Sequence, residues 1–292
     1  MLGSLVDGFL FGFSYALIGI GFTLIFGVMQ KFNLAHGPTA LAGAYLGLAV
    51  YRLSGLVVPS YLLFAVAVTG AGAIGWLVYQ VCFRFLPKEY ELAPLMSSMG
   101  MLILIEEVIS HLTDAQPFEF PNPLLYEAFE FEFGDIILRH DYLLLAAMAL
   151  AVVGMLYYLI FHTRLGLATR AISQQPVAAQ LCGARIDRVN EMVFVLSAGI
   201  AGATGFMVAM TIGTIIPGLA SVMTIKGLVV AVFGGLGSVP GAVIAGLILG
   251  MLEAETSYLF NATIRDIVAY LVLFAVLVVR PTGLLGKRSL YQ

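Results

Sequence analysis

The side chains that could perform catalysis are few and lie far apart in this 292-residue chain. No His-Glu-x-x-His motif occurs, and the four histidines are scattered. Ser238 stands in GGLGSVPG, but Leu236 and Pro240 occupy the positions where a G-x-S-x-G nucleophile elbow needs glycine. The GKRS at Gly286 lacks the upstream glycine of a phosphate-binding loop. We therefore expect no catalytic residue, no metal site and no enzymatic activity in this chain.

Ionisable residues inside apolar stretches are the remaining candidates for chemistry, because a charge in lipid is costly and usually functional. Glu106 and Glu107 lie in MGMLILIEEVISHLT, and Lys226 lies in VMTIKGLVVAV. A proton-coupled carrier would use such groups as relays. Both glutamates fall toward the outer end of their predicted helix, and Lys226 falls at an outer entrance where it can snorkel to water. Interfacial or inter-subunit pairing is therefore the preferred interpretation over a direct transport role.

The elements that must position these residues are membrane-spanning helices. Hydrophobic residues make up 61% of the chain, charged residues 11%, and the mean hydropathy is +1.00. A bilayer core of about 30 Å needs about 20 apolar residues of helix. The apolar runs are continuous, whereas the strands of a membrane barrel alternate apolar and polar residues. The fold class is therefore all-α, a polytopic helical integral membrane protein.

Positive charge orients the predicted spans, because cytoplasmic connections are rich in Lys and Arg. Ten of the fourteen Lys and Arg residues fall in four connecting or terminal segments, which places the N-terminus outside and the C-terminus in the cytoplasm. Spans are predicted near residues 6–28, 39–51, 60–83, 92–110, 142–161, 192–212, 226–235, 241–252 and 264–279. Several are short, so eight spans with glycine-broken half-helices and nine full spans both remain open.

The outer connection, residues 111–141, is the acidic part of the chain. Within it FEFEFGDIILRHDY alternates apolar and charged residues around Gly134-Asp135. This pattern predicts a small β-hairpin with glycine at its tight turn. A lid on the outer helix ends is the preferred role, with a partner-binding surface as the alternative.

Two stretches of the chain resemble each other. LIFGVMQKFNLAHGPTALAGAYLG near the start and VVAVFGGLGSVPGAVIAGLILG near the end each place a short polar turn before a helix rich in Gly and Ala. Transporters often build their path from such paired, glycine-broken segments. Close helix packing through small residues is the other explanation, and the two are compatible.

The segment 163–190 is basic and helix-prone, between two highly apolar stretches. Residues 164–174 predict one helix, and Pro176 is well placed in the first turn of a second helix that ends at Gly183. Its small and polar residues suit a protein groove better than a membrane surface. The sequence therefore predicts a cytoplasmic docking element.

These motifs identify a family. Ala178-Ala179-x3-Gly183 resembles the core of the loop by which ABC importer permeases contact their ATPases, although Val177 replaces the usual acidic residue and the downstream Ile-x-Leu-Pro is missing. Over nearly its whole length, the chain resembles the shorter permease subunit of branched-chain amino acid ABC importers. FGVMQKFNLAHGPTALAGAYLG, TRLGLATRAISQQPVAAQLCGARIDRVN, VFGGLGSVPGAVIAGLILGMLE and VRPTGLLG carry the resemblance.

The resemblance implies a single permease domain over residues 1–292 in the inner membrane of a prokaryote. Its partners would be a second permease, two ABC ATPases that use the ATP, and an extracytoplasmic binding protein that delivers the amino acid; the chain itself would need no cofactor. The expected ATPase-coupling residues are Arg170, Gln175, Ala178, Ala179 and Gly183. The expected pathway and gate residues are Asn33, His36, Gly37, Gly234, Gly235, Gly237, Ser238, Pro240 and Gly241. Urea or amide import is the alternative substrate class, and a stand-alone secondary carrier is the alternative mechanism.

Overall fold

The computed structural model describes residues 2–54, 58–86, 92–120, 131–133, 136–138, 140–260, 262–280 and 282–286. This part of the chain has a helix at each of the nine predicted span positions. These helices are α1 (Leu2–Met29), α2 (His36–Ser54), α3 (Ser60–Tyr79), α4 (Ala93–Leu112), α5 (His140–His162), α8 (Ile186–Ile212), α9 (Leu219–Gly234), α10 (Val239–Leu259) and α11 (Ala262–Val279).

The predicted fold class is confirmed. Within the described residues, six helices are long and apolar enough to cross a bilayer: α1, α3 with its π-helical extension η1 (Gln80–Arg84), α4, α5, α8 and α10. Helix α9 has 16 residues, fewer than the roughly 20 that a full span needs. It is the kind of short element that the sequence left open as a half-helix.

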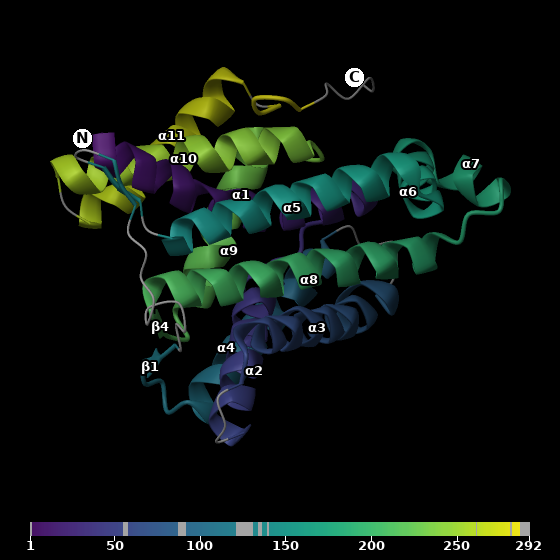
Figure 1. Cartoon of the computed structure of the whole chain (residues 1–292). Helices are drawn as coiled ribbons and strands as arrows, with labels where there is room; N and C mark the ends of the chain where they lie inside the picture. The colour runs from purple at the N-terminus through teal and green to yellow at the C-terminus, as the bar shows by residue number, and fades with distance from the viewer. Residues whose placement is uncertain are drawn as a thin grey trace.

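Helix α1 packs along α10 and also contacts α5, α8 and α9, while α2 and α3 pack on the other side of α8 (Figure 1). Glycines bring α1 and α10 together. A Cβ added at Gly12 would lie 2.9 Å from the Gly246 carbonyl oxygen, and one added at Gly250 would lie 2.5 Å from the Gly12 Cα. Gly8-x3-Gly12 faces Gly246-x3-Gly250, the small-residue spacing that lets membrane helices approach closely.

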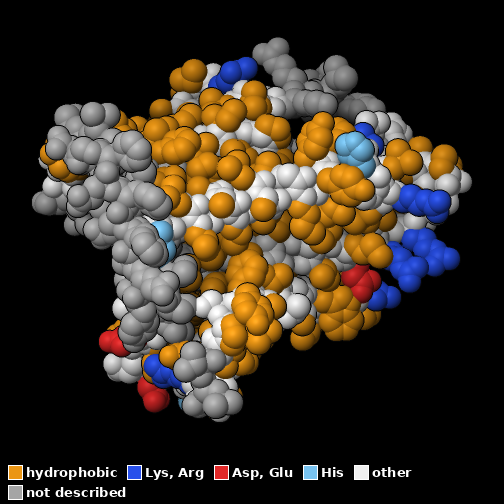
Figure 2. Space-filling model, viewed as in Figure 1, with side chains coloured by type: hydrophobic (Ala, Val, Ile, Leu, Met, Phe, Trp, Pro, Cys, Tyr) orange, Lys and Arg blue, Asp and Glu red, His pale blue; other side chains and the backbone are white. Residues whose placement is uncertain are grey.

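The surface divides into a wide apolar belt and charged ends (Figure 2). Exposed Leu150, Met155 and Tyr158 on α5 belong to this belt. Lys and Arg side chains gather at the end of the bundle where α5 meets α8, the end opposite the beginning of α1 (Figures 1 and 2). This separation of charge fits the predicted orientation, with the basic end toward the cytoplasm.

The predicted β-hairpin is confirmed, and its position on the outer side stays a prediction. Strand β2 (Phe131–Phe133) pairs antiparallel with β3 (Ile136–Leu138), with Phe133 opposite Ile136. The turn residues Gly134 and Asp135 lie outside the described residues. A second pair of strands had no signal in the sequence: β1 (Phe118–Glu119) pairs antiparallel with β4 (Thr214–Ile215) and ties the loop after α4 to the α8–α9 connection.

Helix α2 begins well inside the bundle rather than at its basic end. The chain leaves α1 at Met29 and turns back, so that His36 reaches the level of Gly21, about 12 Å along α1 from its end. Asn33 caps this entry, because its side-chain Oδ1 accepts a hydrogen bond from the Ala35 backbone N–H at 3.1 Å. The expected glycine- and histidine-containing break is therefore a helix start buried among α1, α8 and α9.

Candidate functional site

The predicted docking element has the expected local structure. Helix α6 (Arg164–Gln174) begins at Thr163, whose Oγ1 accepts a hydrogen bond from the Gly166 N–H at 3.2 Å. Helix α7 (Pro176–Leu181) follows after one residue, with proline in its first turn. Gly183 has a φ of +89°, the left-handed conformation predicted for the stop. Both short helices lie together at one end of the bundle (Figure 1).

The two faces of α7 differ. Val177 and Leu181 are 72% and 84% exposed, and Ala178 is exposed with them. Ala179 is only 5% exposed, because it packs into a cluster with Ile172 of α6 and Val189 of α8. The expectation that Ala179 contacts the ATPase is therefore corrected. Ala179 packs α7 against α6 and α8 of its own chain, whereas the neighbouring Ala178 is exposed.

Of the other expected coupling residues, Gln175 is exposed between α6 and α7. Arg170 turns back toward α5: its Nε donates to the Gly166 carbonyl at 3.4 Å, and its guanidinium lies 5.2 Å from the Phe161 ring centroid. The arginines exposed at this end are Arg84, Arg164, Arg185 and Arg188.

The expected pathway residues form two separate turns. At the first turn, His36 packs edge-on against Phe22, and its Nδ1 lies 3.5 Å from the Ser197 Oγ. Gly37 needs its small size, because an added Cβ would lie 2.1 Å from the Thr224 Oγ1.

The second turn joins α9 to α10. Ser238 Oγ caps α10 by accepting from the Gly241 N–H at 3.2 Å, and Pro240 lies in the first turn of that helix. Gly234 and Gly241 pack against each other, while Gly235 and Gly237 have φ values of +100° and +84°. The closing TGLLG covers this turn, since the Leu284 and Leu285 N–H groups donate to Phe233 and Gly234 carbonyls at 2.9 and 3.0 Å.

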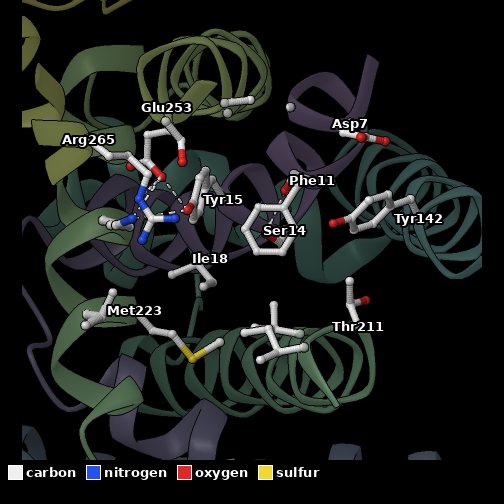
Figure 3. A pocket seen from close by; sticks show the side chains of 18 of the residues that line it. Asp7, Phe11, Ser14, Tyr15, Ile18, Tyr142, Thr211, Met223, Glu253 and Arg265 are labelled. Carbon is white, nitrogen blue, oxygen red and sulfur yellow. Dashed lines mark hydrogen bonds and ion pairs between the residues drawn. The ribbon is translucent and has the colours of Figure 1, made fainter. Parts of the chain in front are cut away.

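A cavity of about 740 Å³ lies elsewhere, and it contains none of the nine expected pathway residues. It runs along α1 from Ser4 to Ile18, about 21 Å of helix, and is bounded by the ends of α8, α9, α10 and α11 (Figure 3). Toward the basic end it stops at a buried apolar plug formed by Ile18, Phe22, Val208, Met223 and Ala231.

A cluster of charges forms one wall of this cavity (Figure 3). Lys226 Nζ donates to the Glu253 Oε2 at 2.9 Å and to the Tyr15 hydroxyl at 3.2 Å. The Tyr15 hydroxyl in turn donates to the same Glu253 oxygen at 2.6 Å. Arg265 Nε lies 3.8 Å from Glu253 Oε2, and Asp266 Oδ1 lies 3.3 Å from Lys226 Nζ.

The expectation that Lys226 snorkels at an entrance is wrong. Helix α9 begins at Leu219, a full two turns earlier than the predicted span, so Lys226 lies mid-helix and is only 4% exposed. Helix α10 likewise continues to Leu259, which puts Glu253 inside the helix rather than beyond its end. On α4, the Glu106 Oε2 accepts a hydrogen bond from the Ser221 Oγ of α9 at 2.8 Å, a contact within the chain, and inter-subunit pairing of these glutamates stays a prediction.

Known proteins resemble this chain along most of its length. The family described as the branched-chain amino acid transport system / permease component matches residues 4–277. The high-affinity branched-chain amino acid transport system permease protein BraD of Pseudomonas aeruginosa is 32% identical over 98% of this chain and 96% of its own length. LivH of Salmonella typhimurium, with the same description, is 33% identical over the same shares of the two chains.

Two solved structures share the fold. A chain of PsaBC from Streptococcus pneumoniae superposes with a TM-score of 0.51 at 14% identity, covering 96% of this chain and 92% of that chain. An inward-facing metal-chelate type ABC transporter superposes with a TM-score of 0.50 at 17% identity, covering 96% and 85%. The nine helices, the paired glycine turns and these similarities lead to one conclusion: the chain belongs to the family of branched-chain amino acid transport system permease components.

Proposed function

We propose that this chain is one of two membrane subunits of an ATP-driven importer, and that it carries branched-chain amino acids delivered by an extracytoplasmic binding protein. The observation that supports this most directly is the family match over residues 4–277 together with the exposed α6–α7 element at the basic end of the bundle. The partners are a second permease, two ATPases that bind and hydrolyse ATP, and the binding protein.

The proposed orientation follows from charge. The basic end with α6 and α7 faces the cytoplasm, and the beginning of α1 faces outward, so the C-terminus lies inside. The protein is then a multi-pass protein of the prokaryotic inner membrane. In this orientation the cavity opens outward and the Gly234–Gly241 turn lies on the cytoplasmic side of the plug.

In the proposed mechanism, ATP binding closes the two ATPases and moves α6 and α7 with them. The movement passes to α8 through the Ile172–Ala179–Val189 contact, which ties the docking element to a long helix beside the cavity. Coupling between two sites can be carried by packed side chains, and the buried cluster provides such a connection in this mechanism.

The test is reconstitution of the complex in proteoliposomes with its binding protein. Uptake of radiolabelled leucine, isoleucine or valine should require ATP inside the vesicles and should survive an uncoupler. Uptake of urea or an aliphatic amide in place of these amino acids would transfer the chain to the alternative substrate class. Uptake without the ATPases that collapses with an uncoupler would make it a secondary carrier.

A further inference from the structure

In the charged cluster at the cavity, two acceptors and one donor are buried without a hydrogen-bond partner among the described residues: Glu253 Oε1, Asp266 Oδ1 and Arg265 Nε. Glu253 uses Oε2 for Tyr15 and Lys226, whereas its Oε1 is buried and has no hydrogen-bond partner among the described residues. Arg265 Nε is likewise buried without a hydrogen-bond partner there, 3.8 Å from Glu253 Oε2. Buried polar groups normally find partners, so a free carboxylate oxygen beside a free guanidinium N–H requires an explanation.

The charges of this wall balance. Four charged residues line the cavity, the cations Lys226 and Arg265 and the anions Glu253 and Asp7, so their charges sum to zero. Stability alone does not explain such a network, because a buried ion pair is often no more stable than a well-packed apolar pair. A neutral wall with local plus and minus sites attracts neither a cation nor an anion strongly. It complements a zwitterion, a molecule that carries one positive and one negative group close together.

The rest of the cavity offers both polar side chains, such as Asp7, Ser14 and Thr211, and apolar ones. The apolar side chains of Ile18, Val208 and Met223 line it and are almost fully buried. Figure 3 shows Ile18 and Met223 among them. The cavity therefore combines apolar contacts with convergent polar groups, a combination that small-molecule sites use for affinity and orientation. The plug below closes it toward the basic end.

We propose that this cavity holds the amino acid during its passage through the permease. Glu253 Oε1 accepts a hydrogen bond from the α-ammonium group, the Arg265 guanidinium donates to the α-carboxylate, and the aliphatic side chain lies against Ile18, Val208 and Met223. The inference rests on the proposed function and adds to it a site on this chain that recognises the zwitterion. Lys226 and Tyr15 are positioning residues, since they hold Glu253 through its other oxygen.

The test uses the assembled complex in lipid nanodiscs, without the binding protein, and L-photo-leucine, a diazirine analogue of leucine. After illumination, mass spectrometry should find adducts on the segments of α1, α8 and α9 that line the cavity. Excess leucine should prevent labelling. The same excess of isoamylamine, which lacks the carboxylate, or of 4-methylpentanoate, which lacks the ammonium, should not.

Two variants decide whether the charged wall is responsible. Lys226→Met combined with Glu253→Gln removes a cation and an anion together, so the wall stays neutral, and labelling should fall about tenfold because charge-assisted contacts are lost. Glu255→Gln is the matched control: it lies two residues further along α10, bonds to Ser4 Oγ at 3.1 Å, and does not line the cavity. Its labelling should equal that of the unmodified protein.

The outcomes separate the two proposals. Labelling that isoamylamine prevents as well as leucine does, or that the double variant retains, would overturn the zwitterion site. So would adducts found only outside the cavity in a complex that imports leucine with ATP, and the proposed function would then stand. A complex that imports urea or an amide but no aliphatic amino acid would overturn the proposed function, and the zwitterion site with it.

Discussion

Lys226 Nζ and Glu253 Oε2 lie 2.9 Å apart, although they belong to different helices and stand on opposite sides of the glycine turn that joins α9 to α10. Their side chains are 4% and 5% exposed. The pair therefore joins the same two helices as the turn, at a second point that lies away from the turn along both helices.

This pairing predicts a non-additive effect on stability. Removing one partner of a buried ion pair typically costs about 3–5 kcal/mol, because the other charge is left uncompensated, whereas replacing both is often near neutral. Lys226→Met should lower the thermal midpoint of the complex strongly, and the added Glu253→Gln should recover most of the loss. A double-mutant cycle on midpoints measures the coupling. Simple addition of the two losses would show that the residues act independently.

The glycine contacts between α1 and α10 predict a steric effect. A Cβ at Gly246 would lie 2.4 Å from the Ala16 backbone N, so Gly246→Ala should destabilise the protein by about 1–3 kcal/mol. A Cβ added at Gly154 of α5 would meet no atom of the described residues within 4 Å, so Gly154→Ala is the matched control. It should be neutral or stabilising by up to about 1 kcal/mol, as expected for glycine in a helix interior. The measurement is the thermal aggregation midpoint of each purified variant. Equal midpoints for Gly246→Ala and Gly154→Ala would contradict the prediction.

At the α9–α10 turn, we expect a substitution that only strains the backbone of Gly237 to have a smaller effect than one that also adds bulk. Gly237 has a φ of +84°, and an added Cβ would lie an ordinary 3.5 Å from Gly27 Cα. Gly237→Ala should therefore cost only the backbone term, about 1–2 kcal/mol, and leave transport measurable. Gly237→Leu adds bulk at the expected gate and should stop uptake while the complex still assembles. Loss of assembly in the Leu variant alone would assign these glycines to helix packing.

The docking element predicts which alanine matters for ATPase binding. Ala178 is exposed and Ala179 is buried, so Ala178→Trp should insert normally yet lose co-purification with the ATPases and ATP-dependent uptake. A central clash at an interface can cost several kcal/mol. Ala178→Ser adds little volume and should retain both properties. Full ATPase binding by the Trp variant would mean that the contact lies elsewhere.

The proposed orientation predicts the accessibility of a native thiol. Cys182 is free and exposed after α7, whereas Cys82 is buried. A membrane-impermeant maleimide should leave intact cells unlabelled at Cys182 and should react with it in inverted vesicles. A cysteine at the exposed Gln116, in a Cys182→Ser background, should behave in the opposite way. Reaction of both positions from one side would overturn the orientation.

Local features of the fold were predictable from the sequence. Pro176 and Gly183 mark the beginning and the end of α7, because their backbone preferences do not depend on distant contacts. The alternation in FEFEFGDIIL similarly predicts the β2–β3 hairpin. The basic end of the bundle was predictable for the same reason, because the number of Lys and Arg residues in each connecting segment does not depend on distant contacts.

The charged wall was not predictable in this way. Its members come from α1, α9, α10 and α11, and the sequence pattern ended the tenth helix just before Glu253 because the apolar run ends there. Lys226 looked like a helix end for the same reason. The sequence offered one signal for this pair: Lys226 and Glu253 stand at the two ends of the uncharged residues 227–252. It gains meaning only once the α9–α10 turn brings those ends together.

The apolar plug of Ile18, Phe22, Val208, Met223 and Ala231 also has an electrical consequence. In the proposed orientation, water can enter the cavity from outside down to this layer, so the transmembrane voltage falls across the plug and the protein beneath it rather than across the whole bilayer. Moving one elementary charge through 100 mV involves about 2.3 kcal/mol of work. The Lys226–Glu253 pair beside the plug has no net charge, and a zwitterion has none either. The membrane potential therefore does no net work on a neutral amino acid that crosses this layer, and the direction of its movement must come from the motor.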